Sequence, residues 1–171
     1  MWKNEFTMNK HDSMRGWFAY ELYQWMKKDK DIYLIVGDLG YGMFDAIRDD
    51  FPDRFLNCGA AEQAMMGIAV GLALEGKKPF IYSITPFLLW RAAETIRLYI
   101  NHERIPIRLV ASGRDKDYEH DGFSHYAGDD KDLLDCFKNI FCVWPDTKEQ
   151  IPDIVEAMIE NNKPWYINLK R

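Results

Sequence analysis

The segment "FLNCGAAEQAMMGIAVGLALEGKKPFIYSI" (residues 55–84) predicts a strand, a helix and a second strand in direct succession. The two strands are short apolar runs at 55–58 and 79–84. Between them, small residues and methionines predict a helix from about 60–75, which Gly76 terminates. Because strands that alternate with helices run parallel within one sheet, the segment predicts a parallel sheet.

The same alternation of strands and helices continues on both sides of this segment. Upstream, apolar residues at helical spacing follow Ser13, and the apolar run "IYLIV" at 32–36 predicts a buried strand. Residues 40–54 are expected to form a loop or a short helix. Downstream we expect a helix with Thr85 as N-cap that runs to about Asn101, followed by a strand at 106–112 and an irregular loop at 113–130. A short helix at 131–137 and a strand at 141–144 come next. The last two elements are a helix that follows an Asp146–Glu149 capping box and ends near Asn162, and a strand at 165–170.

This order of elements predicts the fold class. It is α/β: a three-layer sandwich with a central, mainly parallel sheet of about six strands and helices on both faces. We expect one domain over residues 1–171, which consists of an N-terminal helical segment (1–30) and a core (31–171).

The composition narrows the class of protein. The hydrophobic fraction of 47% and the charged fraction of 29% are those of a soluble globular protein. The net charge of −5 argues against a nucleic-acid partner, because phosphate binding requires a basic surface. No apolar run reaches the length of a membrane span and no signal peptide opens the sequence, so we expect a cytoplasmic protein. Cys58, Cys136 and Cys142 lack the spacing of metal ligands and are expected to be reduced thiols.

Polar residues that directly follow the predicted strands are the candidates for a ligand site. In an open parallel sheet, ligands bind beyond the carboxyl ends of the strands. Glu62 stands out, since it is a single carboxylate at the start of an otherwise apolar helix, where the backbone dipole favours its ionised form. The alternative is that Glu62 only caps or charges the helix start. The other residues at this edge are Gly37 and Asp38, Ser83 to Phe87, Ser112 to His125, and Pro145 with Asp146.

The loop "YEHDGFSH" (118–125) contains two histidines and two acidic residues. His120 and His125 could be ligands, acid–base groups or plain polar loop residues. A zinc site is not expected, because no cysteine or third histidine is spaced to complete one. The glycines of "GDLGYG" (37–42) do not form a known phosphate-binding motif.

Taken together, these segments resemble the pyrimidine-binding domain of the transketolase-like, thiamine-diphosphate-dependent enzymes. The stretch at 51–84 is similar to the most characteristic part of that domain, with its glutamate at Glu62. "FLLWRAAETIR" (87–97) resembles the aromatic-bearing helix, and "HDGFSH" (120–125) resembles the DG-x-T-H loop. "KPWYINLKR" (163–171) resembles the terminal strand. The segments occur in the order of the family and cover roughly residues 31–171.

The resemblance implies cofactor-binding roles for four residues. Glu62 is expected to be catalytic: it would hydrogen-bond the ring nitrogen of the cofactor's aminopyrimidine and so promote the tautomer that activates the thiazolium carbon. Phe87 would stack on the aminopyrimidine ring, with Trp90 as its companion, although Arg91 arrives earlier than in the family pattern. Asp38 would lie near the thiazolium. The cofactor supplies the carbanion chemistry, and the protein supplies placement and electrostatics.

The resemblance also implies substrate-binding residues. His125 would face the sugar, where it could polarise or orient a hydroxyl group and act in catalysis. Arg171 resembles the arginine that contacts a substrate phosphate, while His120 has no counterpart in the family.

Parts of the family's catalytic apparatus are missing from the sequence. The "GDG…N" motif, whose residues ligate the metal ion of the diphosphate, has no match here, and the third, C-terminal domain is expected to be absent. We therefore expect a partner subunit to hold the diphosphate and its Mg²⁺ or Ca²⁺, in a heterotetramer or a homodimer of heterodimers. The sequence predicts the pyrimidine-binding subunit of a two-component transketolase, which transfers a ketol unit from a ketose, expected to be phosphorylated, to an aldose.

Two alternatives stay open at this point. The chain could be a component of a 2-oxo-acid decarboxylase or dehydrogenase, which the "DGFSH" loop and Arg171 disfavour. It could also be a non-catalytic regulatory subunit of the same fold, which the presence of Glu62, Phe87 and His125 disfavours.

Overall fold

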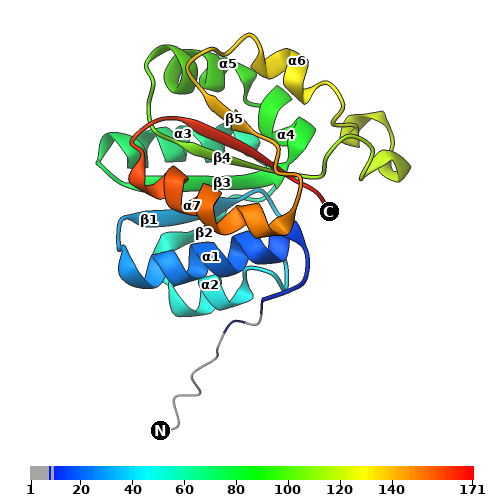
Figure 1. Cartoon of the computed structure of the whole chain (residues 1–171). Helices are drawn as coiled ribbons and strands as arrows, with labels where there is room; N and C mark the ends of the chain where they lie inside the picture. Colours follow the sequence, from blue (N-terminus) through cyan, green and yellow to red (C-terminus); the bar gives the residue numbers. More distant parts are fainter. Residues whose placement is uncertain (1–7, 9) are drawn as a thin grey trace, which may run out of the picture.

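The computed structural model describes residues 8 and 10–171 (Figure 1). Its centre is a six-stranded sheet in the order β2-β1-β3-β4-β6-β5, in which every neighbouring pair is parallel. The strands are β1 (Ile32–Val36), β2 (Phe55–Asn57), β3 (Lys78–Ile84), β4 (Arg108–Ser112), β5 (Phe141–Val143) and β6 (Trp165–Leu169).

Helices cover both faces of this sheet. The α-helices are α1 (Met14–Lys28), α2 (Asp45–Asp50), α3 (Glu62–Leu74), α4 (Thr85–Trp90), α5 (Ala93–Thr95), α6 (Asp130–Leu134) and α7 (Ile151–Glu160). The remaining turns are the π-helix η2 (Ile96–His102) and the 3₁₀ turns η1 (Pro52–Arg54), η3 (Glu119–Asp121), η4 (Phe123–His125) and η5 (Lys148–Gln150). Figure 1 shows α1, α2 and α7 on one face, and α3, α4, α5 and α6 on the other. The predicted three-layer α/β fold is therefore confirmed.

The strand register explains why both faces need a helical cover. Val36, Tyr82, Val110 and Ile167 align across four strands and face the core under α1 and α7. The neighbouring row, Ile35, Ile81, Leu109 and Tyr166, faces the core under α3. Because side chains alternate along a strand, an apolar run buries both of its faces, as in other parallel sheets. In the described part of the chain, no helix is both long and apolar enough to cross a membrane.

The helix predicted from Thr85 to Asn101 is interrupted. It breaks at Ala92, whose φ and ψ are −121° and 18°, and its continuation becomes a π-helix from Ile96. The prediction of Thr85 as N-cap is also wrong. Thr85 is the first helical residue, and its hydroxyl donates to the carbonyl oxygen of Ser112, 3.2 Å away.

The predicted capping box lies one residue further along the chain. Thr147 and Gln150 form it, not Asp146 and Glu149. Thr147 has the extended backbone of an N-cap residue, with φ and ψ of −131° and 156°. The Gln150 side chain accepts from the backbone nitrogen of Thr147 at 3.2 Å, so the motif keeps its spacing but not its predicted position.

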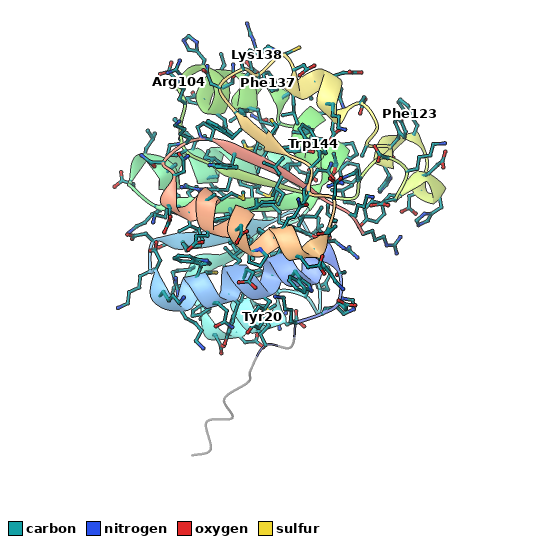
Figure 2. The ribbon with its side chains drawn as sticks, in the orientation of Figure 1. Tyr20, Arg104, Phe123, Phe137, Lys138 and Trp144 are labelled. Atoms are coloured by element: carbon teal, nitrogen blue, oxygen red, sulfur yellow. The ribbon has the colours of Figure 1, made fainter. Side chains whose placement is uncertain are left out.

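The predicted irregular loop at 113–130 is anchored at both ends. At its start, the buried Arg114 guanidinium donates to the carbonyl oxygens of Pro145 and Asn168. At its end, the Asp130 side chain is buried among Trp144, Tyr166 and Asn168. Between these anchors the chain forms the turns η3 and η4. Figure 2 shows Phe123 on the part of the loop that projects from the body of the protein, and this side chain is 86% exposed.

Candidate active site at the carboxyl edge of the sheet

Glu62 lies where β2 delivers the chain to the carboxyl edge of the sheet. Gly59, with a φ of +65°, makes the turn between β2 and α3, and this left-handed conformation favours glycine. The Glu62 side chain is only 2% exposed, and Met65 on the same helix is fully buried. Its carboxylate accepts hydrogen bonds from Arg91, and the Ser83 hydroxyl lies 3.5 Å away. The carboxylate is therefore directed at side chains from neighbouring elements.

Arg91 links Glu62 to the aromatic residues of α4. One nitrogen of its guanidinium, Nη1, lies 3.0 Å from Oε1 and 2.9 Å from Oε2 of Glu62. The guanidinium carbon lies 3.6 Å from the centroid of the Phe87 ring, which is a cation–π contact. The His125 ring meets the Phe87 ring edge-on, with 4.8 Å between centroids. Three of the predicted site residues, Glu62, Phe87 and His125, thus lie in one connected group.

A hollow of about 400 Å³ adjoins this group. Trp90, a further predicted cofactor residue, is 51% exposed and lines the hollow. The other lining residues are Pro86, Phe87, Arg91, Phe123, Ser124, Tyr126 and Asp129. The hollow therefore lies between α4 and the loop that carries His125.

Asp38 is the second residue after β1 and lies close to the same edge. Its φ of +55° is left-handed, a conformation that aspartate tolerates better than most residues. The backbone nitrogen of Asp38 donates to Asn57 Oδ1 at 3.1 Å, and the Tyr41 hydroxyl donates to its carboxylate. A Cβ atom on the preceding Gly37 would lie 3.7 Å from Oε1 of Glu62. The end of β1 and the start of α3 are therefore close to each other.

A second, larger cavity of about 720 Å³ lies on the α1 side of this edge. Its lining comprises Met8, His11, Ser13, Arg15, Gly16, Leu39, Gly40, Tyr41, Gly42, Met43, Ala46, Tyr82, Ile84 and Tyr118. The Tyr82 hydroxyl and Arg15 Nε are both buried without a hydrogen-bond partner among the described residues. Burial raises the pKa of Tyr82 to about 12, so its phenol stays neutral at neutral pH. Two unpartnered donors at a cavity wall are suited to a polar ligand.

Tyr118 connects this cavity to the end of the chain. Its hydroxyl accepts from Arg15 Nη1 at 3.2 Å and lies 3.3 Å from the Ser112 hydroxyl. The Arg171 guanidinium lies 5.1 Å from the Tyr118 ring, and the Arg171 backbone nitrogen donates to Asp117 at 2.9 Å. The predicted phosphate contact, Arg171, is thus placed beside a cavity-lining residue.

His120 lines neither of the two cavities. Its side chain is 62% exposed and lies 3.4 Å from its neighbour Asp121, and its ring centroid lies 6.5 Å from that of Tyr118. Among residues 8 and 10–171, no cluster of three or more histidine, cysteine, aspartate or glutamate side chains is arranged to hold a metal ion.

Arg15 and Tyr82 were not among the residues predicted for the site, and Arg91 was named only as a departure from the family pattern. Tyr118 lies within the predicted candidate range 112–125 but had no role assigned to it. Arg15 and Tyr118 are more than a hundred residues apart in the sequence, and no local periodicity connects them. The sequence signal that could have identified Arg15 is its position in the first turn of the helix that the apolar spacing after Ser13 predicts.

Comparison with known proteins places this geometry in a family. Residues 11–171 match the family described as "Transketolase, pyrimidine binding domain". The chain belongs to this family. The resemblance drawn from the sequence motifs is therefore confirmed.

Individual proteins that are similar to this chain are also named as parts of transketolases. A "putative transketolase C-terminal section" of Methanocaldococcus jannaschii is 28% identical over 162 residues, which are 94% of this chain and 51% of that protein. One of the subunits of an apulose-4-phosphate transketolase from Actinobacillus succinogenes is 32% identical over 120 residues, which are 70% of this chain and 39% of that protein.

A solved structure agrees with these sequence matches. The structure of a split-gene transketolase, described as an inactive β4 tetramer, superposes with a TM-score of 0.82 at 29% identity. It covers 94% of this chain and 52% of that one. The chain thus spans about half the length of the proteins it matches.

Proposed function

We propose that this chain is the pyrimidine-binding subunit of a two-component, thiamine-diphosphate-dependent transketolase, which transfers a ketol unit from a phosphorylated ketose to an aldose. The observation that carries the proposal is the buried carboxylate of Glu62 beside the Phe87 ring, at the sheet edge of a chain of this family. Burial of a carboxylate costs free energy, and an apolar side chain at the same position would avoid this cost. The presence of the acid therefore points to a function and not to packing.

The described residues fit the aminopyrimidine ring of thiamine diphosphate. The Arg91 guanidinium, which is flat and bears nitrogens, lies between the Phe87 ring and the Glu62 carboxylate, and this position supports the proposal. When bound, the cofactor would supply a nucleophilic carbon. Glu62 would hold a proton at the ring nitrogen, and Phe87, with Trp90 nearby, would fix the plane of the ring. Asp38 would border the thiazolium from the end of β1.

A partner subunit is part of this proposal. We infer that a subunit with a "GDG…N" motif holds the diphosphate and its Mg²⁺ or Ca²⁺, in a heterotetramer or a homodimer of heterodimers. Exposed apolar side chains on α3 and α4 support a subunit interface: Ile68 is 41%, Leu74 69% and Trp90 51% exposed. We place the enzyme in the cytoplasm, where free thiols such as Cys58 stay reduced.

Reconstitution tests the proposed function directly. The chain alone is expected to show no turnover, whereas addition of the diphosphate-binding subunit, thiamine diphosphate and Mg²⁺ is expected to produce ketol transfer. The assay compares a panel of ketose phosphates with pyruvate and other 2-oxo acids as donors. Full turnover by the chain alone contradicts partner dependence, and turnover of 2-oxo acids alone indicates a decarboxylase or dehydrogenase component instead.

The cavity of about 720 Å³ is the proposed place of the sugar substrate. Arg15 provides a cation at its wall, and Arg171 reaches its rim beside Tyr118. An anionic sugar is consistent with these charges, and a relative is named for a sugar phosphate. His125, which contacts Phe87, would approach the same substrate from the opposite side of the sheet edge.

Substitution of Arg15 with glutamine tests the place of the phosphate. The KM for a phosphorylated ketose is expected to rise by about 10- to 100-fold, because a charge-assisted hydrogen bond is lost. The KM for an unphosphorylated ketose is expected to stay within about twofold, since the lost interaction involves only the phosphate. Arg48→Gln, which changes an exposed arginine on α2, is the matched control. Equal effects on both classes of ketose would place the phosphate elsewhere.

A further inference from the structure

The Arg91 side chain contacts two of the proposed cofactor-binding residues, Glu62 and Phe87. The residue directly follows α4, at the break before α5, and its side chain lies over Phe87 and against Glu62. The guanidinium is planar, stacks on the aromatic ring at 3.6 Å and donates to both carboxylate oxygens. These are the two contacts that the proposed function requires of the cofactor's aminopyrimidine: a flat face on Phe87 and a nitrogen toward Glu62.

We propose that Arg91 occupies the aminopyrimidine position in the cofactor-free chain and swings out when thiamine diphosphate binds. This inference rests on the proposed function, and it assigns Arg91 control over cofactor occupancy. The two groups exclude each other, because both oxygens of Glu62 and the stacking contact of Phe87 already serve the guanidinium. In the cofactor-free chain, the Arg91 guanidinium thus takes the place of the cofactor's aminopyrimidine ring.

The chemistry of the carboxyl group makes the exchange a switch between two states. The guanidinium, which is always charged, pairs with the ionised carboxylate. An unprotonated ring nitrogen accepts hydrogen bonds, so toward the cofactor Glu62 has to carry a proton and donate it. Departure of Arg91 therefore allows the protonated form that the cofactor's ring requires.

The surroundings of Arg91 permit the movement. Its side chain is 44% exposed, whereas the Glu62 side chain is 2% exposed. Within residues 8 and 10–171, its hydrogen bonds go to Glu62 alone. The hollow of about 400 Å³ that Arg91 lines with Trp90 and Phe123 offers space for the displaced guanidinium next to water. Because the Glu62 end of this pair is buried, loss of Arg91 alone would leave an uncompensated charge. The exchange therefore requires the proton on Glu62 and its hydrogen bond to the cofactor's ring nitrogen to replace the ion pair.

The proposal predicts how cofactor affinity depends on Arg91. When only a fraction of the protein is in the binding-competent state, the apparent dissociation constant rises as the inverse of that fraction. Arg91→Ala is therefore expected to lower the apparent Kd for thiamine diphosphate by about five- to tenfold. Arg91→Lys, which keeps the charge but loses the flat stacking group, is expected to lie between the alanine variant and the wild type.

The test titrates thiamine diphosphate and Mg²⁺ into the chain assembled with its diphosphate-binding subunit, followed by tryptophan fluorescence and calorimetry. Arg97→Ala is the matched control, because it removes the same charge from an exposed position on η2. A second measurement needs no variant at the site. The ¹⁵N-labelled wild-type chain is expected to show an upfield ring-current shift of the Arg91 Hε signal, which saturating cofactor removes.

The outcomes separate this proposal from the one on which it rests. Unchanged or weaker binding by Arg91→Ala overturns the displacement of Arg91, and weaker binding would make Arg91 a direct cofactor contact. An Hε signal that keeps its upfield shift when cofactor is bound overturns it as well. If neither the wild type nor any variant binds thiamine diphosphate, the proposed function itself fails and takes this inference with it.

Discussion

Replacement of Glu62 with glutamine is expected to reduce the turnover number of the assembled enzyme by about 10²- to 10⁴-fold. Glutamine has nearly the same shape as glutamate, so the packing around this buried position, which is 2% exposed, is retained. The amide cannot gain or lose a proton at the cofactor's ring nitrogen, however, and proton transfer by a positioned acid is the step it removes. The measurement is kcat for ketol transfer from a ketose phosphate, with KM and cofactor affinity determined in parallel.

The matched control is Glu75→Gln, which makes the same change in an exposed residue that follows the other end of α3. This variant is expected to keep kcat within about twofold, because surface substitutions away from special features have small effects. An unchanged rate in Glu62→Gln would show that the carboxyl group does no chemistry. That result would favour the non-catalytic, regulatory subunit over the enzyme.

Replacement of Asp130 with alanine is expected to lower the free energy of unfolding by about 3 to 5 kcal/mol. Its buried Oδ2 accepts hydrogen bonds from Trp144 at 2.8 Å, Tyr166 at 2.8 Å and Asn168 at 2.7 Å. Figure 2 shows Trp144 within the body of the protein. Burial, together with the Asp130 charge, raises the pKa of Tyr166 well above its ordinary value, so the phenol remains a donor. Removal of the carboxylate takes the acceptor from the Trp144 and Tyr166 donors. Among the described residues, the Asn168 amide nitrogen keeps only the hydroxyl oxygens of Tyr166 at 3.0 Å and Thr85 at 3.3 Å.

Urea unfolding, followed by circular dichroism, measures this loss. Asp132→Ala on the same helix is the control, since this side chain is exposed and its loss is expected to cost less than about 0.5 kcal/mol. Asp130→Asn keeps one acceptor oxygen and is expected to recover part of the stability. A loss below about 1 kcal/mol in Asp130→Ala would mean that water or a side-chain rearrangement satisfies the Trp144 and Tyr166 donors.

Local patterns were sufficient to predict most of the fold. The apolar run at 32–36 predicts β1 with its observed bounds, and the helix after Gly59 begins within two residues of its predicted start. These elements are fixed by burial on one or two faces, which hydrophobic periodicity records directly. Glu62 could be selected as a candidate for the same reason, because a charge in an apolar pattern is visible in the sequence without any knowledge of its neighbours in space.

Contacts between distant segments were not predictable in the same way. The break at Ala92 and the following π-helix are not marked by a proline or glycine, and Thr85 uses its hydroxyl on a carbonyl group of β4 instead of capping. The contact between Arg91 and Glu62 joins two elements across the sheet edge. Such partners depend on tertiary placement, which propensity and periodicity do not encode.

The anchoring of the segment between Arg114 and Asp130 has an evolutionary consequence. The buried side chains at its two ends hold the segment by hydrogen bonds, whereas the projecting part around Phe123 is exposed. Under the proposed function, substitutions or insertions there would alter which sugars are accepted and leave folding intact. Diversification of such a lineage toward new carbohydrates would therefore be concentrated in this short stretch, with its two flanking anchors held constant.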